Sequence, residues 1–248
     1  MAHTLTAIST NDLFSIVLYT ATAAACIPLG GMLARIEHIH PCWLENEFRH
    51  FVIAFGGGVL VAAVALVLVP EGMRYVVSPG HGTLWMICGG LVFFWLERML
   101  GLVRRESPQF SAMLLDFIPE SLALGGIFAT GAHSAPLLAL LIGLQNLPEG
   151  FNAFREMNAR NGGRAERAHF LMLLLIPVGP AFGLLGWSVF DSLPYLLGAV
   201  MLFAAGGILY LVFQDIAPQS RLKRHWAPPL GAVLGFALAM QAKAALPG

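Results

Sequence analysis

Eight runs of about 20 mostly apolar residues constrain this chain more than any other feature. A helix of that length matches the roughly 30 Å hydrocarbon core of a bilayer. Hydrophobic residues make up 57% of the sequence, charged residues 11%, and the mean hydropathy is +0.74, well outside the range of soluble domains. We therefore predict an all-α membrane protein, one transmembrane domain over residues 1–248, with helices at approximately 13–33, 51–70, 83–100, 110–131, 136–154, 168–190, 193–216 and 228–246.

The basic residues predict how this bundle is oriented. Twelve of the 14 Lys and Arg residues fall in or beside the connections after the first, third, fifth and seventh spans, whereas Arg74 and Lys243 fall on the other side. Cytoplasmic loops are enriched in basic residues. We therefore expect both termini to be extracytoplasmic, which requires an even number of spans.

Several other classes of protein are disfavoured by the composition. The formal net charge is zero, which argues against a nucleic-acid-binding surface. Cys26, Cys42 and Cys88 show no paired spacing, so neither a disulfide framework nor a thiolate metal site is predicted. Residues 1–12 contain no Lys or Arg ahead of an apolar run and do not resemble a cleaved signal peptide.

Two neighbouring spans, 110–131 and 136–154, each carry a proline followed by a glutamate. These pairs are Pro119-Glu120 and Pro148-Glu149, and Asp116 lies one turn before the first of them. A carboxylate at the centre of a bilayer costs about 2.5–3.5 kcal/mol on the insertion scale. Three of them in adjacent helices therefore require a cation, a proton or one another.

The spacing of these residues predicts where they point. Asp116 and Glu120 are four residues apart, as are Gln145 and Glu149, and such pairs share one face of a helix. Each proline also lacks an N–H and frees the carbonyl four residues before it, as in the broken helices of transporters. The alternative is that the prolines only kink the helices and the acids are protonated in the core, which leaves the doubled motif unexplained.

Further polar residues leave two interpretations open. Gln145, Glu149, Asn152 and Glu156 recur every three or four residues, as an exit route or as ordinary solvation of a helix end. Glu71, in Pro70-Glu71-Gly72, could collect cations at an entrance or could mark a helix stop in water. Asp215, before Pro218, could be a ligand at the exit, and Glu97 with Arg98 is interpreted as an interfacial pair. The eight histidines all fall in tails, loops or helix ends.

Taken together, these motifs resemble the ZIP (Zrt/Irt-like) family of divalent metal transporters. The resemblance extends over nearly the whole chain and is specific in the two Pro-Glu spans. It is supported elsewhere by Glu97-Arg98 and by the run Ala204–Tyr210 that leads to Asp215 and Pro218.

The resemblance implies a metal site between the spans 110–131 and 136–154. The family pattern His-Asn-x-Pro-Glu-Gly places Asp116 at the histidine position and Phe117 at the asparagine position, which are both departures. An acidic position in the sixth span falls on Gly179, and a ligand position in the second span falls on Leu60. A binuclear site is therefore not expected, and the metal-binding candidates are Asp116, Glu120, Gln145, Asn146 and Glu149, of which Asp116, Glu120, Gln145 and Glu149 would form a single site.

All of these candidates offer oxygen ligands. Oxygen suits manganese or magnesium, and zinc also accepts carboxylates, so the loss of the histidine should relax the preference for zinc without excluding it. The resemblance favours zinc as substrate, with manganese, iron or cadmium as other substrates. Three carboxylates around a divalent ion leave a net charge near minus one. When the ion leaves, at least one carboxylate should take up a proton, so we expect transport to depend on pH.

The sequence thus predicts a divalent metal permease that carries metal into the cytoplasm by rocking one helix bundle against another. The alternative is a relative that has lost transport and acts as a metal-binding or scaffold protein. We do not expect an enzyme, because no Gly-x-Gly-Asp, His-Glu-x-x-His or Gly-x-Ser-x-Gly motif is present. Its surroundings would be the lipid bilayer of a prokaryotic cytoplasmic (inner) membrane, and a homodimer is a further expectation.

Overall fold

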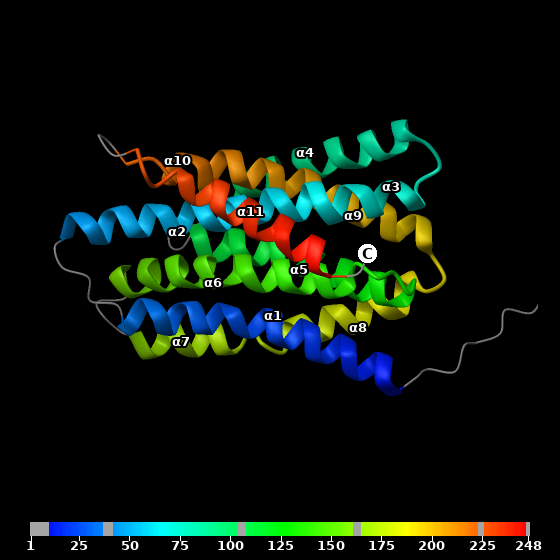
Figure 1. Cartoon of the computed structure of the whole chain (residues 1–248), viewed down its shortest axis with the longest axis horizontal. Coiled ribbons are helices and arrows are strands. Elements are labelled where there is room, and N and C mark those ends of the chain that lie inside the picture. The colour runs from blue at the N-terminus through cyan, green and yellow to red at the C-terminus, as the bar shows by residue number, and fades with distance from the viewer. Residues whose placement is uncertain (1–9, 37–41, 104–107, 161–164, 223–225, 247–248) are drawn as a thin grey trace, which may run out of the picture.

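The computed structural model describes residues 10–36, 42–103, 108–160, 165–222 and 226–246. Within these ranges the chain forms helices joined by short turns, and no strand occurs in them. The helices run side by side along the long axis of the molecule (Figure 1). The predicted all-α bundle is confirmed, with these elements: α1 Thr10–Ile36, α2 Cys42–Ala63, η1 Val64–Leu68, α3 Val69–Tyr75, α4 Pro79–Val103, α5 Pro108–Ala129, α6 Ala135–Arg160, α7 Ala165–Leu173, α8 Val178–Phe190, α9 Pro194–Leu211, η2 Val212–Ile216, α10 Ala217–Gln219 and α11 Leu230–Ala245.

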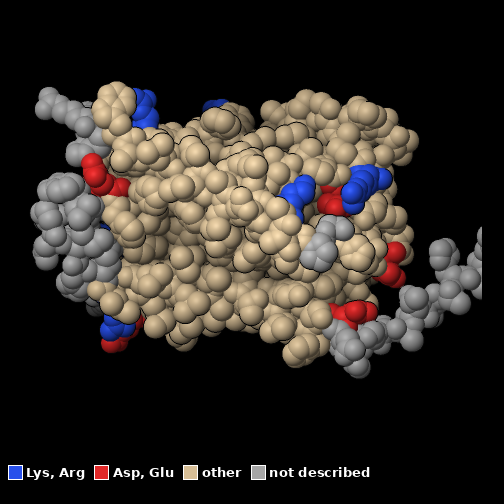
Figure 2. Space-filling model, in the orientation of Figure 1, with Lys and Arg blue, Asp and Glu red and all other residues tan. Residues whose placement is uncertain are grey.

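The two ends of the bundle differ in the connections they carry. The end of α1 and the start of α2 lie at one end (left in Figure 1), and the turns between α3 and α4, α5 and α6, and α8 and α9 lie at the other. We call the first the basic end, which includes Arg35, Arg49, Arg155 and Arg221, and the second the terminal end. Charged side chains gather toward both ends of the face shown in Figure 2, with a broad uncharged surface between them. Such a surface fits a bilayer.

Among the residues that the structure describes, four helical rods are long and apolar enough to cross a membrane. They are Asp12–Ile36, Asn46–Tyr75, Ala165–Phe190 and Pro194–Gln219, and Leu230–Ala245 is a shorter apolar helix. The other predicted spans, in α4, α5 and α6, lie alongside these rods in Figure 1 and stay predictions as membrane crossings. In α6 the reason is plain, because six amides and carboxylates interrupt its apolar residues.

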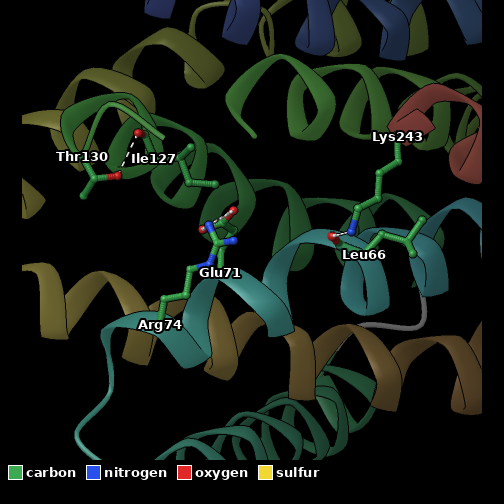
Figure 3. A network of polar contacts seen from close by, with 6 residues as sticks. All are labelled: Leu66, Glu71, Arg74, Ile127, Thr130 and Lys243. Atoms are coloured by element: carbon green, nitrogen blue, oxygen red, sulfur yellow. Dashed lines mark hydrogen bonds and ion pairs between the residues drawn. The ribbon is translucent and has the colours of Figure 1, made fainter. Parts of the chain in front are cut away.

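Two of the rods contain a π-helical segment shortly before a proline. In the rod α2–η1–α3, Pro70 has no N–H, and its ring would clash with the carbonyl of Leu66, four residues before it. The helix widens there into η1, and the Leu66 carbonyl accepts a hydrogen bond from Lys243 Nζ of α11 at 2.9 Å (Figure 3). The second case is η2, which ends at Ile216, two residues before Pro218. Prolines thus alter two helices that the sequence predicts as simple spans.

The predicted span 168–190 is divided in the structure. Turns at residues 174–177 separate α7 from α8, and Pro177 is the residue before the first turn of α8. Pro177 and Pro180 both lack the N–H that would continue the hydrogen-bonding pattern from α7. The apolar run alone did not indicate this break.

Helix packing divides the bundle into two groups. In the first, α1 packs along α6, and α5 packs along α8; in the second, α2 packs along α11, and α4 along α9. The backbones of α1 and α6 touch, because a Cβ at Gly150 would clash with the Ile27 carbonyl oxygen and one at Gly30 with that of Leu147. The helix that carries Glu149 is therefore fixed against α1.

Candidate cation site

The two Pro-Glu motifs lie on the neighbouring helices α5 and α6, inside the bundle. Pro119 and Pro148 are both within their helices, as predicted. The side chains of Asp116, Glu120 and Gln145 are at most 4% exposed. The carboxylates therefore lie in the protein interior and not at a helix end in water.

A hydrogen bond between side chains joins the two helices at the centre of this site. Gln145 Nε2 donates to Glu120 Oε2 at 2.6 Å, and both residues are fully buried. The polar faces of α5 and α6 therefore meet at this level. It also means that one Glu120 oxygen has a neutral donor as its partner, while Glu120 Oε1 and Gln145 Oε1 have none.

Asp116 and Glu149 face a common cavity of about 50 Å³. A water molecule needs about 10–15 Å³ by the same measure, so the cavity has room for an ion with a few waters. The charge of Asp116 interacts with those of both Glu120 and Glu149. The three carboxylates thus form one electrostatic cluster, divided between the cavity wall and the Glu120–Gln145 pair.

This cluster contains many buried oxygen acceptors that lack a donor. Buried polar atoms in folded proteins are nearly always hydrogen-bonded, so each exception calls for an explanation. Here the exceptions lie on α5 and α6, and all are oxygens: Asp116 Oδ1, Glu120 Oε1, Gln145 Oε1, Asn146 Oδ1, both Glu149 carboxylate oxygens and Asn152 Oδ1. A row of acceptors without donors is what a cation would satisfy.

Asn146, the fifth predicted ligand, also serves the scaffold. Its Nδ2 donates to the Ala23 carbonyl of α1 at 2.8 Å, and the residue is buried. Its Oδ1 is among the oxygens without a donor. The side chain therefore ties α6 to α1, and Asn146 is not among the residues that line the cavity of Asp116 and Glu149.

The side chains are not arranged as a closed coordination shell. In the part of the chain that the structure describes, no three His, Cys, Asp or Glu side chains lie close enough together to hold a metal ion. The Gln145 amide bonds to Glu120 on one side, while Asp116 and Glu149 face the cavity on the other. To bind one ion with all of these groups, Gln145 would have to turn its Oε1 toward the cation and Glu120 would have to exchange a donor for it.

Two of the positions where the sequence departs from the ZIP pattern, Phe117 and Gly179, pack against each other. A Cβ added at Gly179 in α8 would lie 3.2 Å from Cζ of Phe117, whose side chain is buried. The phenyl ring therefore occupies space that a longer residue at position 179 would need. This packing is consistent with the expectation of a single site.

The cavity has a second wall that the Pro-Glu motifs alone do not predict. It is built by Ile53, Gly56 and Gly57 of α2 together with Leu211, Asp215, Ile216 and Gln219 from the rod α9–η2–α10. Gln219 Nε2 donates to Asp215 Oδ1 at 3.1 Å. The predicted exit residues Asp215 and Asn152 thus line the same cavity as Asp116 and Glu149.

One signal in the sequence could have identified Gln219. The spacing Asp215-x-x-Pro218-Gln219 repeats Asp116-x-x-Pro119-Glu120 and Gln145-x-x-Pro148-Glu149. All three place two polar residues one turn apart around a proline. Gly56 and Gly57, by contrast, carry no such signal in the sequence. In the structure they allow close helix packing, because a Cβ at Gly56 would lie 2.9 Å from Cγ of Pro148.

Glu71, at the terminal end, behaves differently from the acids of the cavity. The interpretation as a helix stop in water is wrong, because the helix continues to Tyr75 and Glu71 is 7% exposed. Arg74 Nη1 bonds both of its carboxylate oxygens at 3.0 Å (Figure 3). Glu97 lies near Tyr210 and Asp215, and its Oε2 is buried without a hydrogen-bond partner.

The fold and the site together define an integral membrane protein with a carboxylate- and amide-lined site inside a helical bundle. No family model matches the sequence. A stretch of 134 residues is 38% identical to the zinc transporter GufA of Myxococcus xanthus. The matched stretch covers 52% of this chain and 51% of that protein. The chain therefore spans about half the length of the curated relative it matches.

Proposed function

We propose that this protein is a divalent metal cation transporter whose substrate binds between α5 and α6. The observation that carries the proposal is the row of buried oxygens without donors, from Asp116 and Glu120 on α5 to Gln145, Glu149 and Asn152 on α6. A cation at bilayer depth is stable only where protein oxygens replace its water. The similarity to a zinc transporter supports the same conclusion independently.

Zinc is the substrate we expect first, because it accepts carboxylate oxygens and because the matched relative is named a zinc transporter. The site offers carboxylate and amide oxygens, with no imidazole or thiolate among its residues in the described chain. Such a donor set is also suited to manganese and, less well, to iron or cadmium. Zinc should therefore be transported without strong discrimination against manganese.

The route we propose runs from the terminal end to the basic end, which corresponds to import into the cytoplasm in the predicted orientation. Beyond Asp116 and Glu149, the cavity continues to Asn152 and to Asp215 with Gln219. These residues belong to both helix groups, with α5 and α6 on one side and α2 and α9–η2–α10 on the other. A rocking movement of one group against the other would therefore change access to the ion.

The carboxylates also determine the charge balance of transport. Asp116, Glu120 and Glu149 would carry three negative charges against two positive charges on the ion. After release, these three charges would repel one another in a medium of low dielectric constant, so proton uptake should accompany release. Metal movement and proton movement are then linked.

The second candidate function is metal binding without transport, as a sensor or scaffold. The observation that favours it is that Phe117 and Gly179 stand at positions where the ZIP pattern has ligands, and that the two positions pack against each other. Uptake separates the two functions, because a scaffold would bind zinc but would not move it into a sealed vesicle.

The decisive experiment is uptake of radioactive zinc into liposomes that contain the purified protein. We expect uptake well above that of empty liposomes and its loss in D116N, which replaces a cavity carboxylate with a neutral amide of the same shape. D191N is the matched control, because Asp191 is an exposed carboxylate between α8 and α9. Equal zinc uptake by D116N and the unmodified protein would rule out the proposed site, and binding without uptake would favour the scaffold.

A further inference from the structure

A second polar pocket lies at the basic end, away from the cation site. It has a volume of about 490 Å³ and lies between the last turn of α1, the first turns of α2 and the last turns of α6. Its walls are formed by Ala34, Arg49, Phe154, Arg155, Glu156, Asn158 and Ala159. Pockets that hold small organic groups have volumes in this range.

The two arginines of the pocket supply a site for an anion. Arg49 Nε is buried and has no hydrogen-bond partner. The guanidinium of Arg155 lies 5.6 Å from the centre of the Phe151 ring, which in turn contacts Phe48 edge to face at 6.3 Å. Stacking on an aromatic ring limits the orientations of a guanidinium, so Arg155 is held at the pocket before any ligand arrives.

The other polar residues of the pocket restrict the kind of anion. Glu156 is part of the wall, and its carboxylate would repel a bare phosphate. Asn158 Oδ1 is buried without a donor. A ligand that satisfies both Arg49 and Asn158 must accept hydrogen bonds and also donate them. A phosphodiester that carries hydroxyl groups meets both requirements.

The surface beside the pocket indicates where such a ligand would come from. At its basic end, α1 exposes large apolar side chains at helical spacing, namely Leu29, Met32, Leu33 and Ile36. Ala34, in the same turns, belongs to the pocket wall. The pocket therefore opens next to a surface that suits acyl chains, at the level where headgroups of the bilayer lie.

We propose that this pocket binds the headgroup of an anionic phospholipid with a hydroxylated phosphodiester, of the phosphatidylglycerol type. The phosphate would lie between Arg49 and Arg155, and a headgroup hydroxyl would donate to Asn158. Arg49 belongs to the helix group of α2 and Arg155 to that of α6. A bound headgroup would therefore connect the two groups at the basic end.

Native mass spectrometry of the full-length protein in detergent tests this site. The protein is titrated with phosphatidylglycerol and with phosphatidylcholine of the same acyl chains, and lipid binding is compared for the unmodified protein, R49Q and R98Q. We expect phosphatidylglycerol to bind about tenfold more tightly than phosphatidylcholine, and R49Q to lose that preference. R98Q is the matched control, because Arg98 is an exposed arginine of α4 outside the pocket, and it should keep the preference.

N158A adds an independent arm in case R49Q does not fold. It should weaken phosphatidylglycerol binding and leave binding of phosphatidic acid, which has no headgroup hydroxyl, unchanged. Equal losses in R49Q and R98Q would overturn the proposal, since they indicate general attraction to basic residues. Displacement of the lipid by an equal concentration of inorganic phosphate would also overturn it and would assign the pocket to a soluble anion.

Discussion

The dipeptide Pro-Glu occurs in three helices of this protein, and its surroundings at the terminal end differ from those at the centre. At Pro70-Glu71, Arg74 bonds the carboxylate, and Lys243 bonds the carbonyl that the proline leaves free. At Pro148-Glu149, the carboxylate oxygens are buried without a donor. The same dipeptide thus carries a glutamate paired with an arginine in one region and a glutamate whose oxygens have no donor in the other.

This difference shows that the motif alone does not define a cation site. A buried carboxylate is stable with a fixed positive charge, with a proton or with a bound ion. Where the chain supplies the positive charge itself, as with Arg74, the acid has a structural role. Where it does not, as around Asp116 and Glu149, an exchangeable cation can take that position. The following predictions test this distinction.

The largest effect should follow from giving the central site its own cation. In Q145K, the lysine ammonium would replace the amide that now bonds Glu120, so the centre would resemble the Glu71–Arg74 pair. We expect zinc binding, measured by calorimetry, to weaken by at least about a hundredfold. Q145M, which removes the amide without adding charge, is the control and should weaken binding less. Similar affinities for Q145K and Q145M would show that charge does not determine occupancy.

The second effect compares the two kinds of glutamate directly. E149Q removes a carboxylate that lines the cavity, whereas E71Q removes one already paired with Arg74. We expect the initial rate of zinc uptake into liposomes to fall about tenfold or more in E149Q and less than about twofold in E71Q. A loss in E71Q as large as that in E149Q would place Glu71 in the transport route and would abolish the contrast.

Acidification should lower the affinity for zinc through the carboxylates of the cavity and not through Glu71. Protons compete with the metal for the carboxylates of the cavity, so the apparent affinity for zinc should fall as pH falls, by up to about tenfold per pH unit for each proton displaced. The measurement is the zinc concentration for half-maximal uptake at several pH values. E149Q should show a shallower dependence than the unmodified protein, and E71Q an equal one. The same pH dependence in all three proteins would show that Glu149 is not the group at which protons compete with zinc.

The smallest effect concerns stability alone. K243M removes the donor to the Leu66 carbonyl next to η1, and we expect a loss of about 1 kcal/mol, seen as a Tm lowered by a few degrees. K243R keeps a donor and should restore the Tm. Zinc affinity should be the same in all three proteins, because Lys243 lies outside the cation site. A changed affinity in K243M would show that the proline break in α2–η1–α3 is coupled to the centre.

Much of this arrangement could be predicted from the sequence, because local patterns determine it. The apolar runs indicate the helices, and the spacing of Asp116, Glu120, Gln145 and Glu149 indicates the two facing polar sides. The π-helical segments and the break at residues 174–177 were not predicted, because they depend on how a proline is accommodated by its neighbours. The partners of Leu66 and Asn146 come from helices far away in the sequence, Lys243 and Ala23, and no local pattern identifies such pairs.

The close contact of α1 with α6 has a practical consequence. With no side chain at Gly30 or Gly150 to act as a spacer, the two backbones are in direct contact, so we expect α1 to follow any displacement of the part of α6 that carries Glu149. The lipid-facing side of α1 thereby becomes a readout for the interior. A spin label or fluorophore at Leu33, which is 50% exposed, would report movement of α1 together with α6 without altering the carboxylates.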